Sequence, residues 1–544
     1  MRDAIVIGSG ISGMVTAVKL AEEGVSVLLV SPFPSERSQS VMAAGGINAV
    51  LTDCEPGDSV ACHIEDTLKG GCYIAGRDSV TGLCESAEEI IRYLEGIGTV
   101  FSVDDDGRPA RRAFGGQSYK RTCYCGSATG KQIVTALVME ARRLEASGKI
   151  RRGLGKCFHS ALIKDGVCYG ALFFDEHTGN ISAEYADAVV VATGGQNALF
   201  GKTTGSTQCD GYTAGKLFTQ GVELKNLEFI QFHPTTIETS QKRMLLSEAA
   251  RGEGGRLFYL DKGKRVYFME DKYGPGGNLL PRDIVSREIY GAGSEVFLDV
   301  SFLKESEIDK RIPEVRELCK KYIGLDIASE PIPVAPSVHF FMGGIAVHND
   351  HETNIRNLFA VGECASMYHG ANRLGGNSLL AAIHSGMIAA REIAGRDAVT
   401  DKPDFSQAER EANESLAEMR NTKSVFPVMY IRDMAAETMN KSMGIIREEA
   451  SIKEGITDID YYLSIAEKLS YDNSVLPYFN YSLSGILTLA RAVLTCADAR
   501  KESRGAHFRG DFPDTFDEYA HPTIVSYDNG QYNTRLDKEN EYES

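Results

Sequence analysis

The sequence of residues 4–13 is AIVIGSGISG, an apolar run followed by three glycines with the spacing GxGxxG. A helical pattern over about 12–23 and a second apolar run over 25–30 follow it. This order of strand, glycine turn, helix and strand is typical of a Rossmann-like unit, which binds a dinucleotide pyrophosphate at the helix N-terminus. We therefore predict a nucleotide-binding α/β domain in this part of the chain.

The second strand of this unit ends at Ser31, where NAD-binding proteins usually have an Asp or Glu that binds the ribose. This departure makes an NAD-type dehydrogenase the weaker interpretation and favours FAD. Further along, AVVVATGG (188–195) predicts a strand that ends in a second nucleotide-side turn, and Asp210 lies in a loop where FAD contacts are expected. The candidate cofactor-binding residues of these segments are Gly8, Ser9, Gly10, Ser12, Gly13, Ser31, Ala192, Thr193, Gly194 and Asp210.

The segment HGANRLGGNSLL (369–380) places two glycines and an arginine before a predicted helix over 379–393. Glycines allow close backbone approach, and a helix start presents unpaired N–H groups to an anion. We expect Asn377 or Ser378 to be the N-cap, and Arg373 to offer a planar fork to a carboxylate. The alternative for this stretch alone is a surface arginine on a glycine-rich loop.

The segment SERSQSVMAAGGI (35–47) also contains two adjacent glycines, which suggest backbone lying against a flat ligand, although a plain turn has the same composition. Together with the start of the 379–393 helix, this segment completes the set of candidate cofactor contacts. The added residues are Ser38, Gln39, Ser40, Ala44, Gly45, Gly46, Glu363, Asn377, Ser378 and Leu379.

The composition excludes several classes of protein. The 544 residues carry a net charge of −17, which argues against a general nucleic-acid binder. No stretch approaches the roughly 20 apolar residues of a membrane span, and the early strand leaves no room for a signal peptide. None of the 12 cysteines forms a CxxC pair, so we expect neither a zinc site nor an iron–sulfur cluster within the chain, and no metal ligands. These features predict a reduced, cytoplasmic protein.

Five motifs occur in a characteristic order along the chain: NLEFIQFHPTTI (226–237), LLSEAARGEGGRL (245–257), PRDIVSREI (281–289), VAPSVHFFMGGI (334–345) and the 369–380 segment. Together they resemble the succinate dehydrogenase/fumarate reductase flavoprotein family, to which L-aspartate oxidase also belongs. The resemblance extends over nearly the whole chain, and five motifs in order are far more specific than any one alone.

The resemblance implies an α/β fold in which a Rossmann-like FAD-binding domain carries an inserted α+β capping domain, with a helical domain after it. The expected bounds are 1–225 and 346–400 for the FAD-binding domain, 226–345 for the capping domain and 401–512 for the helical domain. The remaining polar tail, 513–544, shows no pattern that we can interpret. The substrate is then expected at a domain interface.

The resemblance also implies two carboxylate clamps and a proton source on the side of the substrate opposite the flavin. An arginine is a poor acid in water, so it can donate a proton only if neighbouring groups reprotonate it. From spacing alone, Glu248 and Arg251 are equally an i,i+3 structural ion pair. By the resemblance, Arg373 and His339 form one clamp, His233 and Ser247 form the other, and Arg282 transfers the proton with Glu248 and Arg251 as its relay.

Three departures from the family pattern and one difference from the aspartate oxidases refine this expectation. Membrane-bound members have a flavin-linked histidine where this chain has Gln39, so FAD should be bound noncovalently. Ala44 stands where many members have glutamine beside the flavin, and Ser247 replaces a threonine but keeps the hydroxyl. Aspartate oxidases have a glutamate at the position of Phe114, which gives a substrate ammonium no partner here.

We therefore expect a FAD-dependent enzyme that interconverts fumarate and succinate, with fumarate reduction the favoured direction. The main alternative is L-aspartate oxidase, which the segment ATGKQI (128–133) slightly favours. A second alternative is a FAD-binding scaffold protein that catalyses no reaction. The resemblance implies an iron–sulfur electron-transfer subunit, or another redox partner, which could also associate the protein with a membrane.

Overall fold

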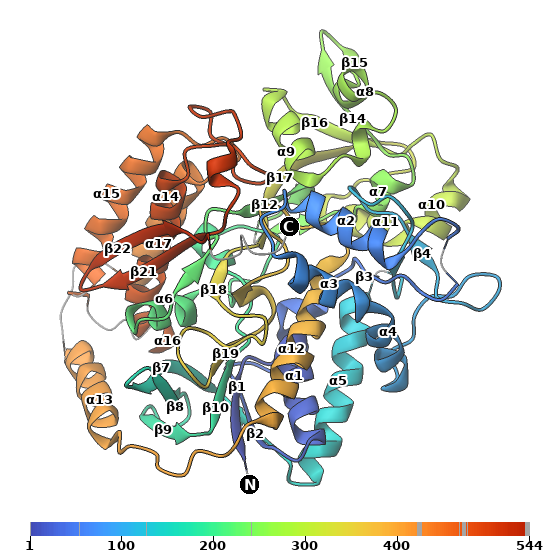
Figure 1. The fold of residues 1–544 in the computed structure, drawn as a ribbon. Coiled ribbons are helices and arrows are strands. Elements are labelled where there is room, and N and C mark those ends of the chain that lie inside the picture. Colours follow the sequence, from blue (N-terminus) through green and yellow to red (C-terminus); the bar gives the residue numbers. More distant parts are fainter. Residues whose placement is uncertain are drawn as a thin grey trace.

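The computed structural model describes residues 2–538 except 54, 127, 241, 422–426, 467, 470–474 and 476. At its base lies a five-stranded parallel sheet in the order β19-β10-β1-β2-β6 (Figure 1). The three central strands are β10 (Ala188–Val191), β1 (Asp3–Ile7) and β2 (Ser26–Ser31), and the edges are β19 (Leu358–Ala360) and β6 (Ile150–Leu154). This arrangement confirms the predicted Rossmann-like α/β unit.

Alternate residues of these strands face two different layers, because successive side chains of a strand point to opposite faces. Val6 and Val190 belong to the core shared with three helices: α1 (Ile11–Glu22), α5 (Thr129–Ala146) and α12 (Asn377–Gly395). Ile5 and Val189 face the core shared with a three-stranded antiparallel sheet: β7 (Lys156–Lys164), β8 (Val167–Asp175) and β9 (Ile181–Tyr185). Both faces are covered, which explains the continuous apolar runs in the sequence.

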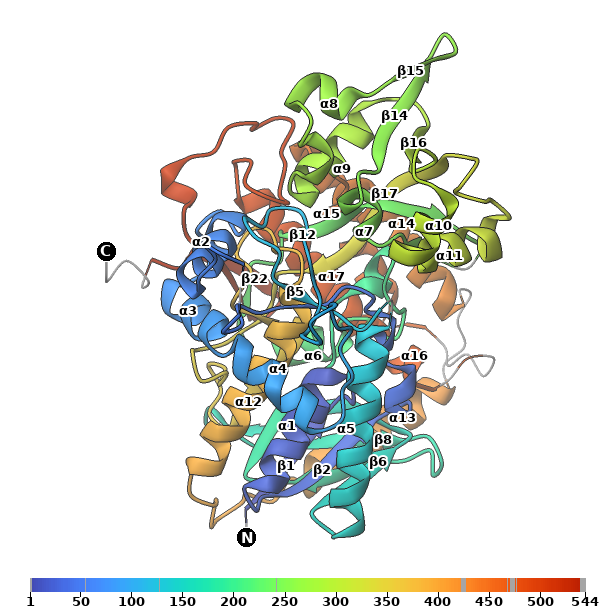
Figure 2. The ribbon, with the colours of Figure 1, turned by 90° about the vertical axis from the view of Figure 1, so that its right-hand side faces the viewer.

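The helix α12 packs directly against α1, and the two lie side by side in Figures 1 and 2. A Cβ on Gly386 of α12 would lie 2.9 Å from the carbonyl oxygen of Ser12 in α1, so only glycine permits this approach. The close packing brings the start of α12, and with it the 369–376 loop, to the carboxyl ends of the parallel strands.

The polar tail after Pro513, in which the sequence analysis found no pattern, contains regular structure. Residues 523–536 form a hairpin of β21 (Thr523–Asp528) and β22 (Gln531–Leu536). It completes a five-stranded sheet with β11 (Leu224–Lys225), β18 (Gly344–Ala346) and β20 (Ala365–Ser366). Asn529 and Gly530 both have positive φ, at 48° and 86°, as a two-residue hairpin turn requires. The Asn-Gly pair between alternating strands was the signal for this hairpin.

A second unit stands above the parallel sheet (Figure 2). Its six-stranded antiparallel sheet has the order β13-β12-β17-β16-β14-β15, and its core, from Ile237 to Val334, is a cluster of its own. The capping unit proposed at 226–345 contains this core. The strands are β12 (Ile230–Glu238), β13 (Arg243–Leu245), β14 (Arg256–Asp261), β15 (Lys264–Val266), β16 (Val296–Asp299) and β17 (Ile332–Phe341); the helices are α7 (Ala249–Gly252), α8 (Phe268–Tyr273), α9 (Arg282–Gly291), α10 (Glu305–Arg311) and α11 (Pro313–Ile323).

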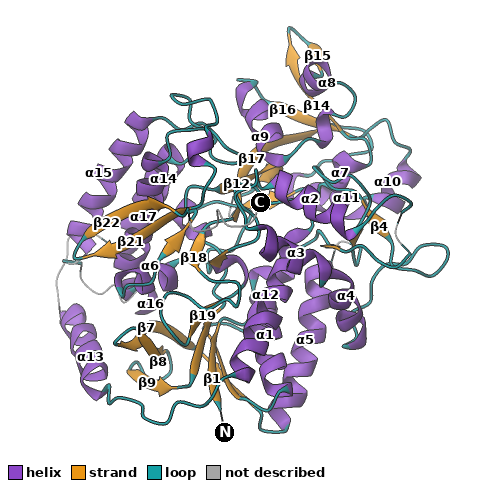
Figure 3. Ribbon diagram, viewed as in Figure 1, coloured by secondary structure: helices purple, strands orange, loops and turns teal. Residues whose placement is uncertain are grey.

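The region after residue 400 is mainly helical, as expected (Figure 3). None of the helices in the described ranges is long and apolar enough to cross a membrane. The helices of this region are α13 (Ser406–Asn421), α14 (Val428–Ser442), α15 (Glu449–Ala466), α16 (Pro477–Tyr481) and α17 (Leu483–Ala499).

The remaining elements lie earlier in the chain. The helices are α2 (Val60–Gly70), α3 (Arg77–Glu85), α4 (Ala87–Gly96) and α6 (Tyr212–Thr219). A small antiparallel sheet consists of β3 (Ile47–Asn48), β4 (Arg111–Arg112) and β5 (Thr122–Cys123).

Candidate active site

A cavity of about 660 Å³ lies between the carboxyl ends of β1, β2 and β10 and the capping sheet. Ligands of open α/β sheets bind at this edge. Almost all of the predicted site residues line the cavity. They are Gly8, Ser9, Gly10, Ser12, Ser31, Ser38, Gln39, Ser40, Ala44, Gly45, Gly46, Phe114, Ala192, Thr193, Gly194, Asp210, His233, Ser247, Glu248, Arg282, His339, Glu363, Arg373, Ser378 and Leu379.

One end of the cavity has the chemistry that a dinucleotide needs. A Cβ on Gly8 would lie 2.2 Å from the carbonyl oxygen of Ala192, so β1 and β10 approach closely where the backbone faces the cavity. The N-terminus of α1 lies at the same end of the cavity, and the N–H of its first residue, Ile11, donates to the Ser40 hydroxyl at 3.1 Å. The buried Ser38 hydroxyl has no hydrogen-bond partner among the described residues. This cradle of helix N-terminus, glycine backbone and free hydroxyl fits FAD.

Two acids, the partly buried Glu363 and the buried Asp210, line the same region. Oε1 of Glu363 accepts a 3.1 Å hydrogen bond from the Phe341 N–H, and burial raises the pKa of Glu363 to about 7. Oδ1 of Asp210 accepts from the Tyr478 hydroxyl at 2.9 Å and from the Tyr212 N–H at 3.0 Å, and burial raises its pKa as well. The bond to Tyr478 connects the cavity wall to helix α16 of the helical region.

The predicted proton relay is a buried chain of three charged side chains. Nε and Nη2 of Arg282 donate to Oε2 of Glu248 at 3.0 and 2.7 Å. Nη2 of Arg251 lies 3.2 Å from Oε1 of the same carboxylate, and Nη1 of Arg251 donates to the Asn278 carbonyl at 2.6 Å. Arg251 does not line the cavity; it lies behind Glu248. Glu248 and Arg282 both line the cavity, and Arg282, at the first position of α9, is the cation of this chain that faces a ligand.

Glu248 is ionised in this environment. Burial acts to raise its pKa, but the charges of Arg282 and Arg251 and their hydrogen bonds outweigh burial and lower the pKa to about 2. The carboxylate therefore accepts protons readily only from a strong acid, and it holds both guanidinium groups in place.

The two predicted clamp histidines lie in edge-to-face contact in the wall of the cavity, with ring centroids 5.2 Å apart. Nδ1 of His339 lies 2.8 Å from the Thr204 hydroxyl. Burial, reinforced by the charge of Arg282, holds the pKa of both histidines well below the usual value, so both rings are neutral at pH 7. Neutral imidazoles beside Ser247 can donate hydrogen bonds to carboxylate oxygens without adding charge.

Arg373 is a buried cation without an ion-pair partner in the part of the chain that the structure describes. Its side chain lies over the Phe340 ring at 4.2 Å, and its Nε has no hydrogen-bond partner there. Burial and the charge of Arg282 hold the pKa of Arg373 well below its ordinary value. An anion in the cavity would supply the missing counter-charge.

The sequence analysis missed Gln231, which contacts both cavity arginines. Its Oε1 accepts from Nη1 of Arg282 at 3.1 Å and from Nη2 of Arg373 at 3.0 Å. A local signal for Gln231 was present in the sequence. In the strand IQFH (230–233) the polar residues Gln231 and His233 are two positions apart, and this spacing places both side chains on the same face of a strand.

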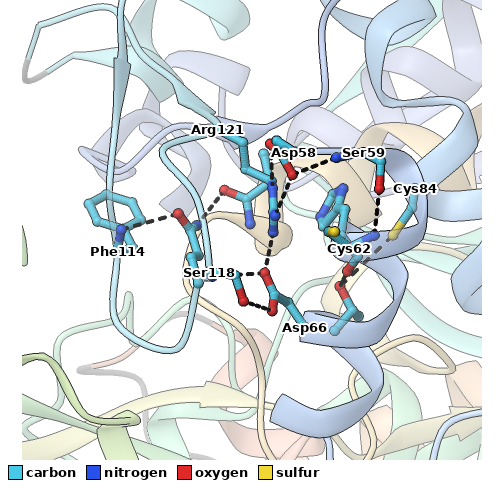
Figure 4. A network of polar contacts seen from close by, with 12 residues as sticks. Asp58, Ser59, Cys62, Asp66, Cys84, Phe114, Ser118 and Arg121 are labelled. Carbon is cyan, nitrogen blue, oxygen red and sulfur yellow. Dashed lines mark hydrogen bonds and ion pairs between the residues drawn. The ribbon is translucent and has the colours of Figure 1, made fainter. Parts of the chain in front are cut away.

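A buried salt bridge anchors the loop that carries Phe114 (Figure 4). Arg121 pairs with Asp58 and Asp66, and Asp66 also accepts from the Ser118 N–H and hydroxyl at 2.9 and 2.6 Å. The Phe114 N–H donates to the Gln117 side chain at 3.2 Å. These contacts fix Phe114 in the cavity wall, where a substrate ammonium would find only an aromatic ring.

Two predicted cofactor contacts lie outside the cavity lining. Gly13 lies within the first turn of α1, where a Cβ would be 2.0 Å from the Gly8 carbonyl oxygen, so its role is in packing. Asn377 is fully buried and does not cap α12; Gly376, with φ of 86°, precedes the helix. Oδ1 of Asn377 instead accepts from Asn48 at 2.7 Å and lies 3.0 Å from Nε2 of His63. Within the described ranges no group of His, Cys, Asp or Glu side chains could hold a metal ion.

The fold and the cavity define a flavin-binding oxidoreductase. Residues 3–379 match the family model of the FAD binding domain, and residues 432–542 match that of the fumarate reductase flavoprotein C-terminal region. The chain belongs to the succinate dehydrogenase/fumarate reductase flavoprotein family, as its motifs predicted, and is a FAD-dependent oxidoreductase.

Relatives of known name match over most of their length. The chain is 35% identical to the succinate dehydrogenase flavoprotein subunit of Bacillus subtilis, with 94% of this chain and 92% of that one covered. It is 34% identical to the 8-methylmenaquinol:fumarate reductase flavoprotein subunit of Wolinella succinogenes, with 94% and 86% covered. A solved structure of a variant of the E. coli quinol fumarate reductase superposes with a TM-score of 0.90 at 29% identity, with 98% and 96% covered.

Proposed function

We propose that this flavoprotein interconverts fumarate and succinate, with fumarate reduction as the favoured direction. The observation that carries this proposal is Arg373: a buried guanidinium without a counter-ion among the described residues, facing the cavity that also contains the cofactor cradle. A second cation, Arg282, faces the same space. Among the described residues, Arg282 has one carboxylate partner, Glu248, which it shares with Arg251, and Arg373 has none, so net positive charge is left for an anionic substrate.

A C4 dicarboxylate suits this arrangement because it presents a carboxylate at each end. Arg373 and His339 would bind one carboxylate, and His233 and Ser247 the other. FAD, bound noncovalently in the cradle, supplies the hydride carrier. Phe114 and the neutral histidines limit the space between the clamps and exclude water from it, and the two bound ends orient the carbon–carbon bond.

Arg282 would deliver the proton to the substrate carbon. Its guanidinium is held at two points by Glu248 and at a third by Gln231, so the group is oriented before substrate binds. Once Arg282 has lost its proton, one of the two charges that lower the pKa of Glu248 is gone, so this carboxylate would take a proton from Arg251 and pass it to Arg282. Arg251 would in turn regain its proton from solvent. Between turnovers both arginines are charged and lower the pKa of Glu248 to about 2, so the carboxylate is ionised.

L-aspartate oxidase is the alternative activity within the same family. Its substrate carries an ammonium, and Phe114 offers that group no hydrogen-bond acceptor or charge. Burying an unpaired ammonium would cost several kcal/mol. The cavity arginines would also repel it, so we propose the dicarboxylate without an amino group as the substrate.

Electrons must reach the flavin from another molecule, and we propose a redox partner, for which the first candidate is an iron–sulfur protein. Two of the relatives are named as subunits, one of succinate dehydrogenase and one of a fumarate reductase. Such a partner is also the proposed route of any association with a membrane.

The direct test uses the purified protein reconstituted with FAD. Dithionite should bleach the flavin, and anaerobic addition of fumarate should restore its yellow colour with formation of succinate. Aspartate-dependent hydrogen peroxide production, with no reoxidation by fumarate, would instead assign the oxidase activity.

A further inference from the structure

Gln231 is the shared partner of the two cavity arginines. It is fully buried on β12, and one atom, Oε1, accepts a hydrogen bond from each guanidinium, at 3.1 Å from Arg282 and 3.0 Å from Arg373. Because both guanidinium groups are cationic, they repel each other, and a common acceptor between them offsets that repulsion.

The other end of the amide fixes its orientation. Nε2 of Gln231 donates to Oδ1 of Asn372 and to the backbone carbonyl of Arg373, both at 2.8 Å. In the side-chain amide of Gln231 the nitrogen is a donor and the oxygen is an acceptor. Because the nitrogen faces two acceptor oxygens, the amide oxygen must face the two arginines. All the polar atoms of the side chain are thereby used.

Asn372 extends this hydrogen-bond network from the loop before α12 to α9 of the capping unit. Its Nδ2 donates to Oδ1 of Asp283 at 2.8 Å, and Asp283 directly follows Arg282 at the start of α9. The pairs Arg282-Asp283 of the capping unit and Asn372-Arg373 of the loop before α12 thus face each other, with Gln231 bonded to three of the four residues.

We infer that Gln231 is a positioning residue that sets the spacing of the proton-donating Arg282 and the substrate-binding Arg373, with Asn372 holding its amide; this inference rests on the proposed function. A neutral amide holds both guanidinium groups and leaves their charge available to the substrate. A carboxylate at this position could also accept from both guanidinium groups, but it would neutralise part of their charge and would place an oxygen against the Asn372 and Arg373 oxygens that the amide nitrogen now binds. The chemistry therefore explains why glutamine, and not glutamate, stands here.

Two isosteric variants separate these effects. Gln231→Met removes the acceptor and the donor, so Arg282 loses its alignment, and we expect kcat for fumarate to fall by about 10- to 100-fold. Gln231→Glu retains the acceptor and adds a negative charge, so KM should rise at least about tenfold while kcat changes less. Gln407→Met, at an exposed position on α13, is the matched control and should match the wild type.

A structural readout tests the same inference without turnover. Hydrogen exchange of the protein should increase in Gln231→Met at both 282–291 and 369–376, because the variant breaks bonds to both segments. Asn372→Ala should give a smaller loss of kcat, and the loss in the double variant should be less than the product of the two single losses, since both changes break the Gln231–Asn372 bond and only the Asn372–Asp283 bond is lost in addition.

Wild-type kcat and KM in Gln231→Met, or the same loss of kcat without a KM change in Gln231→Glu, would overturn the inference. So would unchanged exchange at both segments. If the wild type itself fails to reoxidise with fumarate, the proposed function fails, and the exchange experiment still decides whether Gln231 joins the two segments.

Discussion

The backbone N–H of Gly115 donates a 2.9 Å hydrogen bond to Oε1 of Glu248. Gly115 belongs to the loop that Arg121 anchors, whereas Glu248 belongs to the capping unit and holds Arg282. The carboxylate behind the proposed proton donor is therefore fixed from both sides of the cavity. A change at residue 115 should reach the chemistry although this residue carries no reactive group.

Gly115→Ala should lower kcat by at least about tenfold and leave FAD binding intact. The new Cβ would lie 2.7 Å from Oε1 of Glu248, so the carboxylate must move, and Arg282 moves with it. Steady-state kinetics and flavin content measure the two effects. Gly291→Ala, at the end of the helix that carries Arg282, meets no atom within 4 Å and is the control. Equal kcat in both variants would show that Glu248 does not depend on this contact.

Phe114→Glu should raise KM for fumarate by at least about tenfold, since a carboxylate in the cavity wall repels a dianion. Phe114→Leu keeps the wall apolar and should have a much smaller effect. Initial-rate kinetics over a range of fumarate concentrations give both values. Unchanged fumarate kinetics in the glutamate variant would mean that the substrate does not approach this ring.

Glu248 should make stability depend on pH. Its pKa falls from 4.5 to about 2 on folding, so its pairing stabilises the protein above pH 4.5, and the stabilisation is lost as pH falls toward 2. The full contribution is about 3 kcal/mol, of which about 2 is lost by pH 3. Urea unfolding at pH 7 and at pH 3 should show a smaller acid destabilisation for Glu248→Gln than for the wild type. Identical pH dependence in the two proteins would contradict the assignment.

Acid or denaturant should release all of the flavin. Gln39 lines the cavity and has no nucleophilic ring nitrogen with which to form a covalent bond to FAD. Precipitation with acid followed by absorbance of the supernatant measures the released fraction. Yellow colour that stays with the denatured protein would refute noncovalent binding.

The sequence predicted the parallel sheet and most of the cavity lining because those features have local signals. Apolar runs with glycine turns specify β1, β10 and their neighbours, and the motif residues carry the site chemistry. The partners of those residues had no such signal. Gln231 meets Arg373 across 142 positions of sequence, and Gly115 meets Glu248 across 133, so only the fold brings them together.

One local prediction, the N-cap at Asn377, was wrong, and one local pattern, the C-terminal hairpin, was missed. Asn377 has the composition of an N-cap, but its side chain is more fully hydrogen-bonded as a buried link to Asn48 and Thr67. At Asn377, tertiary contacts outweighed the local preference. The hairpin of β21 and β22, which buries Ile524 and Val525, had the local signal of the Asn-Gly turn, but the polar residues in its strands leave no long apolar run.

Arg282→Lys, measured in a single turnover, tests the account most directly. Lysine keeps one positive charge but loses the planar fork that Glu248 and Gln231 hold, so the variant should still attract the dicarboxylate but deliver the proton poorly. With FAD bound and reduced, we predict that the rate of reoxidation at saturating fumarate falls by about 10²- to 10⁴-fold. The fumarate concentration that gives half of the maximal rate should change much less. Arg282→Lys with an unchanged reoxidation rate and a raised KM would make Arg282 a carboxylate clamp only, and would contradict its role as the proton donor.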